Sequence, residues 1–184
     1  MGAHYRLSGS VGTEQDVDIT EIIVHENYNP NTYRHDIALL RLAQPVLIGQ
    51  GVDTVCLPDT NYPLPLDDPG KKCYITGWGT LSSGGSQPNE LYEASVPLVS
   101  ERRCRKAYKG KMHDSMLCAG LDEGGVDACQ GDSGGPLVCE FNGRWYLEGA
   151  TSWGYGCARP NMYGVYAKVR YLHSWVKSKM GKIA

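Results

Sequence analysis

Residues 127–139, "DACQGDSGGPLVC", crowd acids, cysteines and glycines around a single serine, Ser133. A hydroxyl that attacks a substrate needs exposure, a general base and hydrogen-bond donors for the oxyanion that it creates. Glycines allow tight turns and a close approach of backbone to substrate, so the amides of Gly131 and Ser133 could point at one spot. By itself, however, the short Gly-x-Ser-x-Gly pattern is more simply a glycine-rich turn with a surface serine.

The surroundings of Ser133 decide which serine chemistry fits. In α/β-hydrolases the nucleophile follows a strand, opens a helix, and precedes an acid and a histidine in the chain. Here a loop precedes Ser133 and an apolar, strand-like run follows it. Apart from Glu140, the acid and base candidates after Ser133 are Glu148, in an expected strand, and His173, on an expected terminal helix. We interpret both as structural or solvated residues, and the hydrolase pattern therefore fits poorly.

Length and charge limit the classes of protein. The 184 residues are enough for one domain with a hydrophobic core. The net charge of −2, without a basic stripe, argues against nucleic acid or an anionic membrane as the main partner. No apolar run approaches the roughly 20 residues of a membrane helix. The first ten residues, "MGAHYRLSGS", lack the apolar centre of a signal peptide.

The seven cysteines indicate disulfides rather than a metal site. No Cys-x-x-Cys pair occurs, and no histidine lies at zinc-site spacing from a cysteine, so we expect no metal. Scattered cysteines in a turn-rich sequence favour disulfides in an oxidising compartment. Because seven is odd, one cysteine is free or pairs outside this chain, and spacing alone does not define the other pairs.

Short alternating runs broken by turn residues predict an all-β fold with a terminal helix. Asn142-Gly143 favours a type I′ turn, so residues 135–153 should form one hairpin. In the tail "VRYLHSWVKSKM", apolar residues recur at helical spacing and can pack on a core. The expected strands are 16–24, 72–78, 91–99, 135–141, 144–153 and 163–169, and the expected helices are 100–108 and 169–180.

Four further motifs accompany "DACQGDSGGPLVC": "HDIALLRL", "CYITGWGT", "MLCAG" and "SWGYGCARP". In this order they resemble the trypsin/chymotrypsin serine endopeptidases over nearly the whole chain. The resemblance implies a double β-barrel with a C-terminal helix, of which the first barrel is incomplete here. It describes residues 1–184 as one partial protease domain: the remainder of the N-terminal barrel (1–70), the C-terminal barrel (71–170) and the helix (171–184).

The resemblance also implies roles for individual residues. Ser133 corresponds to the nucleophile, and the amides of Gly131 and Ser133 correspond to the oxyanion hole. Asp36, in "HDIALL", corresponds to the carboxylate that orients the catalytic histidine. Read alone, Asp36 is an acid at the mouth of a strand, and a turn or cap would explain it.

A substrate pocket follows from the same resemblance. Asp127 corresponds to the acid at the base of the primary specificity pocket, which implies cleavage after Lys or Arg, since a buried unpaired carboxylate favours a cation. Gly154 and Gly164 correspond to positions that leave this pocket open. Ser152 and Trp153 correspond to the strand edge that pairs with an extended substrate.

The catalytic base is not evident in this sequence. None of the five histidines lies in the Ala-Ala-His-Cys setting that the family uses, and His35 would point away from Asp36 if both lay on one strand. Asp132 corresponds to the acid that pairs with the ammonium group released by zymogen cleavage. This chain begins Met-Gly, so we expect Asp132 to lack that partner, the oxyanion hole to be poorly formed, and the 184 residues alone to be inactive.

The resemblance implies the pairs Cys73–Cys139, Cys104–Cys118 and Cys129–Cys157. Cys56 corresponds to the cysteine that links the domain to an upstream propeptide or light chain, although a free intracellular thiol is the alternative. The implied protein is secreted and acts on protein or peptide substrates, with serpin or Kunitz-type inhibitors as further partners.

Tyr163 replaces a common proline, and in some relatives this accompanies a bound sodium ion; an aromatic strand residue is the plain alternative, and we expect no other cofactor.

Two functional hypotheses remain. The first is a trypsin-like endopeptidase, in which Ser133 forms an acyl-enzyme that water then releases. The second is a non-catalytic homologue that acts as a binding or signalling module, for which the unidentified base is the support. The simultaneous presence of Ser133, Asp36 and Asp127 favours the first, since a binding module needs none of the three together. A chain with an unpaired barrel edge should also be prone to aggregation.

Overall fold

The structure is a computed structural model that describes residues 1–58, 60, 63–68 and 71–181. It contains a closed six-stranded barrel, a separate two-stranded antiparallel sheet and two helices, in agreement with the predicted fold class. The strands are β1 (Ile19–Val24), β2 (Ala38–Leu42), β3 (Lys72–Gly77), β4 (Tyr92–Val99), β5 (Met116–Ala119), β6 (Pro136–Phe141), β7 (Arg144–Trp153) and β8 (Gly164–Lys168). The helices are α1 (Glu101–Ala107) and α2 (Val169–Met180).

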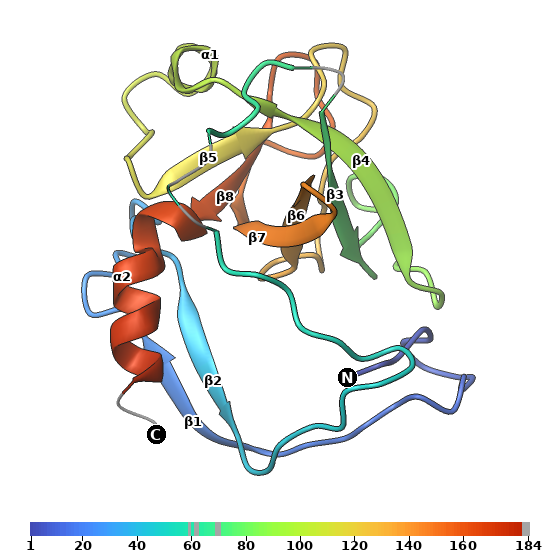
Figure 1. Ribbon diagram of the computed structural model, residues 1–184. Coiled ribbons are helices and arrows are strands. Elements are labelled where there is room, and N and C mark those ends of the chain that lie inside the picture. The colour runs from blue at the N-terminus through green and yellow to red at the C-terminus, as the bar shows by residue number, and fades with distance from the viewer. Residues whose placement is uncertain (59, 61–62, 69–70, 182–184) are drawn as a thin grey trace.

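The barrel closes in the order β3-β4-β5-β8-β7-β6, with every neighbouring pair antiparallel (Figure 1). Alternation along β4 and β6 sends Val96, Leu98 and Leu137 inward, where all three are fully buried. Tyr166 of β8 completes this core and is fully buried as well. Burial of these side chains stabilises the fold by about 25 cal/mol per Å² of apolar surface.

Sequence reasoning located six of the strands and both helices, with ends that shift by a few residues. The predicted strand 16–24 begins at Ile19, and the predicted helix 100–108 spans Glu101–Ala107. At the hairpin between β6 and β7, Asn142 and Gly143 have φ values of 51° and 74°, as a type I′ turn requires. Strand β5 was not among the predicted strands; it is four residues long and entirely buried, so it shows no alternation.

Helix α2 joins the barrel to the two-stranded sheet. Its apolar face buries Leu172 and Val176, and its first turn carries Arg170. The Arg170 guanidinium forms an ion pair with Glu148 of β7 (Nη2–Oε1, 2.7 Å), whose side chain is 0% exposed. Glu148 is thus a structural residue, as the sequence suggested, and the pair fixes α2 on the barrel.

The sheet of β1 and β2 lies beside α2, away from most of the barrel (Figure 1). One of its faces carries apolar side chains that remain open to solvent: Ile22, Val24 and Leu40 are 64%, 52% and 54% exposed. Solvent-exposed apolar strands favour association with another surface. This observation supports the expectation that the chain is prone to aggregation. No helix among the residues that the structure describes is long and apolar enough to cross a bilayer.

Three disulfides link the same cysteines that the resemblance implies: Cys73–Cys139, Cys104–Cys118 and Cys129–Cys157. The first joins residues that face each other across β3 and β6. The second ties α1 to β5, and the third connects the Ser133 loop to the segment after β7. Within the described residues Cys56 is the free cysteine, and its backbone pairs with Trp145 and Leu147 of β7.

Three histidine rings form a row between the two-stranded sheet and the barrel. The ring of His35 lies 4.8 Å from that of His25 and 5.1 Å from that of His113. Trp175 of α2 stacks on the other side of His25 at 4.7 Å. The row therefore joins the residue after β1, the turn before β2, the loop before β5, and α2.

The histidines at both ends of this row are held as neutral acceptors. The amide of Asn27 donates to Nδ1 of His25, and that of Ser115 donates to Nδ1 of His113, both at 3.1 Å. A protonated nitrogen accepts no hydrogen bond. Burial, aided by the neighbouring His35, lowers the pKa of His25, and burial with Arg34 lowers the pKa of His113.

We expect the fold to lose stability as the pH falls through these lowered pKa values. Both groups are ordinary histidines with a pKa near 6.5 when unfolded, so their contribution is present above pH 6.5 and lost below it. Between pH 8 and pH 5, the free energy of unfolding measured in urea should fall less for the double variant His25→Asn/His113→Asn than for the parent. Asparagine keeps a hydrogen-bond acceptor but does not titrate. His173→Asn, on α2 outside the row, is the control. Equal losses in parent and double variant would contradict this account.

Candidate active site

A cavity of about 150 Å³ opens at the junction of the Ser133 loop with β7 and β8. The residues around it come from three segments distant in sequence, two of which the Cys129–Cys157 disulfide connects. Ser133 lies at this cavity with its side chain exposed to solvent. The sequence-predicted residues that line it are Asp127, Ser133, Ser152, Trp153, Gly154 and Gly164.

Backbone turns hold the Ser133 loop against β7. The Asp132 amide donates to the Cys129 carbonyl (3.0 Å), and the Gly134 amide donates to the Thr151 carbonyl of β7 (2.8 Å). Gly131 has a φ of 100°, a left-handed conformation that residues with side chains adopt with strain. In the part of the chain that the structure describes, the amides of Gly131 and Ser133 donate to no other protein atom. Both donors are therefore open to a ligand.

Asp127 lines this cavity, and its carboxylate is only partly compensated. Its Oδ2 accepts a hydrogen bond from the Ala158 amide (3.1 Å), whereas its Oδ1 is buried without a partner. Burial raises the pKa of Asp127 to about 6, although the Ala158 and Ala128 amides oppose the shift. Near pH 7 the group is therefore mostly ionised, and its free oxygen favours a cation.

Strand β8 approaches Asp127 so closely that it excludes a side chain at Gly164. A Cβ on Gly164 would lie 2.5 Å from Asp127 Oδ1 and 2.9 Å from the Tyr166 hydroxyl. At Gly154 an added Cβ would meet its nearest protein atom at 3.7 Å, an ordinary contact. Packing thus requires glycine at position 164. At position 154, the space that a side chain would fill is open to a ligand.

Asp36 reaches the same region from the two-stranded sheet. Its Oδ2 accepts a hydrogen bond of 2.6 Å from the Ser152 hydroxyl, across 116 residues of sequence. Ser152 lies where the pairing of β7 with β8 shifts between Thr151 and Trp153. Such a bulge re-aims a side chain, and it explains how Ser152 joins Asp36 to the cavity edge.

His35 and Asp36 do not lie on one strand, which corrects the reasoning applied to them above. His35 occupies a turn with a φ of 54°, and β2 begins two residues after Asp36. The ring of His35 stacks in the histidine row, while Asp36 bonds to Ser152. Across the described residues, no histidine ring is hydrogen-bonded to Asp36 or Ser133. That the base lies outside the five histidines stays a prediction.

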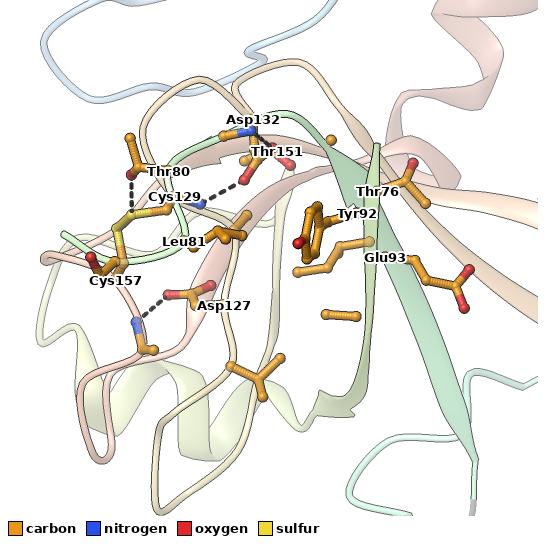
Figure 2. Close-up of a pocket in the computed structure, with 18 of the residues that line it drawn as sticks. Thr76, Thr80, Leu81, Tyr92, Glu93, Asp127, Cys129, Asp132, Thr151 and Cys157 are labelled. Carbon is orange, nitrogen blue, oxygen red and sulfur yellow. Dashed lines mark hydrogen bonds between the residues drawn. A yellow bond between two sulfur atoms is a disulfide. The ribbon is translucent and has the colours of Figure 1, made fainter. Parts of the chain in front are cut away.

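Asp132 lines a second, larger cavity of about 420 Å³ (Figure 2). Asp127 lines both this cavity and that of Ser133. The Asp132 carboxylate accepts the amides of Gly79 (2.8 Å) and Cys129 (3.0 Å). The Met1 ammonium lies elsewhere and donates to the Gln15 carbonyl. Within the described part of the chain Asp132 forms no ion pair.

Tyr163 is an aromatic residue that lies directly before strand β8. Its hydroxyl donates to Asp122 (2.9 Å) and accepts from Arg103, and its carbonyl accepts the Tyr108 hydroxyl (2.5 Å). Both oxygens thus form hydrogen bonds within the protein. A sodium ion near Tyr163 stays a prediction, and we derive no step from it. The described residues contain no cluster of three or more His, Cys, Asp or Glu that could hold a metal.

Sequence reasoning missed two contributions to these cavities. The Tyr166 hydroxyl is buried without a partner next to the position that a Gly164 side chain would take. Gly77 and Gly79, on either side of Trp78, leave room for the Asp132 carboxylate, since a Cβ on either would overlap it. The pair of glycines in "TGWG" was the available signal, but nothing in the sequence says which side chain they admit.

Comparisons with a family model and with individual known proteins agree with one another. The sequence model of the trypsin family matches residues 1–176. The chain is 43% identical to "Trypsin-1" of Astacus astacus over 94% of its own length and 71% of that protein, and 42% identical to "Trypsin-3" of Salmo salar over 98% and 72%. It is 45% identical to "Transmembrane protease serine 11C" of Mus musculus over 89% of its length, but spans 38% of that relative.

We expect Asp127→Asn to stabilise the fold at pH 8 and to do so much less at pH 4. The pKa of about 6 in the folded state exceeds the unfolded value of 3.8, so ionised Asp127 lowers the free energy of unfolding above pH 6. This penalty disappears as the pH falls through 6. The gain at pH 8 should be about 1–3 kcal/mol in urea unfolding. Asp53→Asn, at an exposed position, is the control. A gain that does not change with pH would contradict the assignment.

Proposed function

The chain belongs to the trypsin family of serine proteases, and we propose that it carries the nucleophile and the specificity pocket of an endopeptidase that cleaves after Lys or Arg. The observation that carries this proposal is that Ser133 and the under-compensated carboxylate of Asp127 line one cavity. A reactive hydroxyl and a negative charge at one cavity together select a cationic side chain next to the cleaved bond.

The proposed reaction begins with attack of Ser133 Oγ on the carbonyl carbon of the peptide bond. The amides of Gly131 and Ser133 would stabilise the oxyanion, because they donate to no group among the described residues and are free to donate to it. The leaving amine departs with a proton, and water then releases the acyl group from Ser133. The residues from Ser152 to Gly154 pair with the extended substrate as an added strand.

A general base must come from an imidazole outside these 184 residues. Asp36 is the group that would orient it, since Asp36 is fixed by Ser152 at the cavity edge. Without that base the Ser133 hydroxyl stays protonated and weakly nucleophilic, and the chain alone has no useful protease activity. The domain therefore works as part of a longer protein, in which Cys56, the free cysteine among the described residues, bonds to an upstream segment.

The proposed setting is extracellular. Three disulfides and the family both favour an oxidising compartment, where the substrates are proteins or peptides and proteinaceous inhibitors can occupy the same cavity. Residues 1–70 would then be the remainder of a first barrel, which fits the exposed apolar face of β1 and β2.

A longer form that contains the upstream sequence should react with a fluorophosphonate probe after proteolytic activation, and Ser133→Ala should abolish labelling. The 184-residue chain should label at least about a hundredfold more slowly, since general-base catalysis contributes roughly 10²–10⁴-fold. If the activated longer form does not label at Ser133, the non-catalytic binding module becomes the better explanation.

Asp127 should determine specificity in the same longer form. Asp127→Asn is expected to reduce kcat/KM for Lys and Arg ester substrates by about a hundredfold or more, because the buried guanidinium or ammonium group loses its counter-charge. Asp53→Asn should leave these rates unchanged. Retention of the Lys/Arg preference by Asp127→Asn would exclude Asp127 as the specificity residue.

A further inference from the structure

Two segments of the chain surround Asp127, and they are joined to each other. The first, residues 122–127, ends at Asp127 itself. The second, residues 158–164, supplies the Ala158 amide that donates to Asp127 (3.1 Å) and the glycine at 164 that lies against its carboxylate. Two backbone hydrogen bonds of 2.9 Å link the segments. The position of Asp127 therefore depends on where both segments are anchored.

Arg103 of α1 holds both segments at the ends that lie away from Asp127 in sequence. Its guanidinium forms an ion pair with Asp122, the first residue of the first segment. The same nitrogen, Nη2, donates to the hydroxyl of Tyr163 in the second segment at 3.1 Å. The Tyr163 hydroxyl in turn donates to Asp122 (2.9 Å), so the three side chains form a closed triangle. The guanidinium also lies over the Tyr163 ring, 5.7 Å from its centroid.

The helix that carries Arg103 is itself fixed to the barrel. Cys104, the next residue, is tied to β5 by a disulfide. Tyr108, just after α1, is buried and donates to the Tyr163 carbonyl at 2.5 Å. On its other side the Arg103 guanidinium forms an ion pair with Asp67 at 3.0 Å. Arg103 thus extends from a rigid support to the two segments.

We propose that Arg103 is a positioning residue for the pocket around Asp127. By holding one end of each segment, it keeps the Asp127 carboxylate buried beside the Ser133 cavity. Arg103 itself lines neither that cavity nor the one at Asp132. The inference rests on the proposed function, in which Asp127 binds the cation of the substrate, and it adds a residue outside the pocket that controls how well Asp127 does so.

Removal of the Arg103 guanidinium would leave two carboxylates without their common partner. Asp67 and Asp122 both bind it, so their like charges lie close enough to repel each other once it is gone. The side chain of Asp122 is 59% exposed and can move outward into solvent. Because backbone hydrogen bonds link the two segments, a displacement at Asp122 is transmitted to both sides of Asp127.

Arginine suits this position better than lysine. The planar guanidinium presents several donors in a fixed geometry, whereas an ammonium group is a compact point charge. At position 103 the guanidinium meets three oxygen acceptors at once, on Asp67, Asp122 and Tyr163. A lysine would keep the charge but not the whole set of contacts.

Arg105 provides a matched comparison on the same helix. It also forms two ion pairs, with Glu101 and Asp114, but neither acid belongs to the segments around Asp127. Ion pairs as exposed as those of Arg103 and Arg105 contribute little to stability. A difference between the two arginines in ligand binding would therefore report position rather than the stability of the fold.

The test is the affinity of the 184-residue chain for p-aminobenzamidine, an aromatic amidinium, measured by fluorescence titration at pH 8. The parent should bind, and Asp127→Asn should not. Arg103→Met should bind about 3- to 30-fold more weakly, the range for residues that act on a ligand without touching it. Arg103→Lys should lie between these two, and Arg105→Met should bind like the parent.

The pH profile of binding separates positioning from a merely structural role. Burial raises the pKa of Asp127 to about 6, with the nearby Asp132 adding to the shift, so amidinium binding to the parent should increase as the pH rises through about 6. In Arg103→Met the pocket opens to water, and the midpoint should move down toward the ordinary value of 3.8. A residue that only stabilises the fold would leave the midpoint of the folded protein unchanged.

Tyr163→Phe is the second variant, because it removes one corner of the triangle and keeps the ring. It should weaken binding and lower the midpoint in the same direction, and it decides the matter if circular dichroism shows that Arg103→Met does not fold. The inference is overturned if the folded variants bind like the parent, if the midpoint stays at about 6, or if Arg105→Met weakens binding equally. A parent that binds no better than Asp127→Asn would overturn the proposed cation pocket itself, and the inference with it.

Discussion

The incompletely compensated carboxylate of Asp127 is the constraint around which the functional half of the molecule is arranged. A buried charge with a free oxygen lowers the stability of the fold. Rigid elements surround Asp127 and hold it in place despite this cost. The Cys129–Cys157 disulfide, strand β8 with Gly164, and the buried Tyr166 all adjoin it. The same residue lines two cavities, one with Ser133 and one with Asp132. In the proposed function, recognition of a cation and placement of the nucleophile would therefore both depend on a single loop.

The second theme is the connection between the two-stranded sheet and the barrel. The Asp36–Ser152 hydrogen bond, the Glu148–Arg170 ion pair and the row of histidines span segments that are far apart in the chain. All three connections involve β7 or α2, so the barrel and its terminal helix position the acid that lies just before β2. This explains how Asp36 can lie near the Ser133 cavity although its own sheet is exposed on one face.

Much of this arrangement could be predicted from the sequence, because alternation, turn residues and motifs are local signals. The strands around Asn142-Gly143 and the helix through Leu172 and Val176 are examples. Strand β5 could not, since it is short and buried on both sides. Nor could the turn at His35, the bulge that aims Ser152, or the Tyr166 hydroxyl, which has no partner among the described residues, because each depends on how separate segments pack together.

The three disulfides differ in burial. Those within the barrel and α1 are buried, whereas the one at the Ser133 loop is partly exposed. Cys73, Cys104, Cys118 and Cys139 are each 6% exposed or less, whereas Cys129 and Cys157 are partly open to solvent. Thiol reagents reach accessible sulfur atoms first. A mildly reducing environment would therefore release the loop beside the proposed substrate pocket while the barrel stays closed. The molecules would then keep their shape but lose the proposed discrimination among ligands.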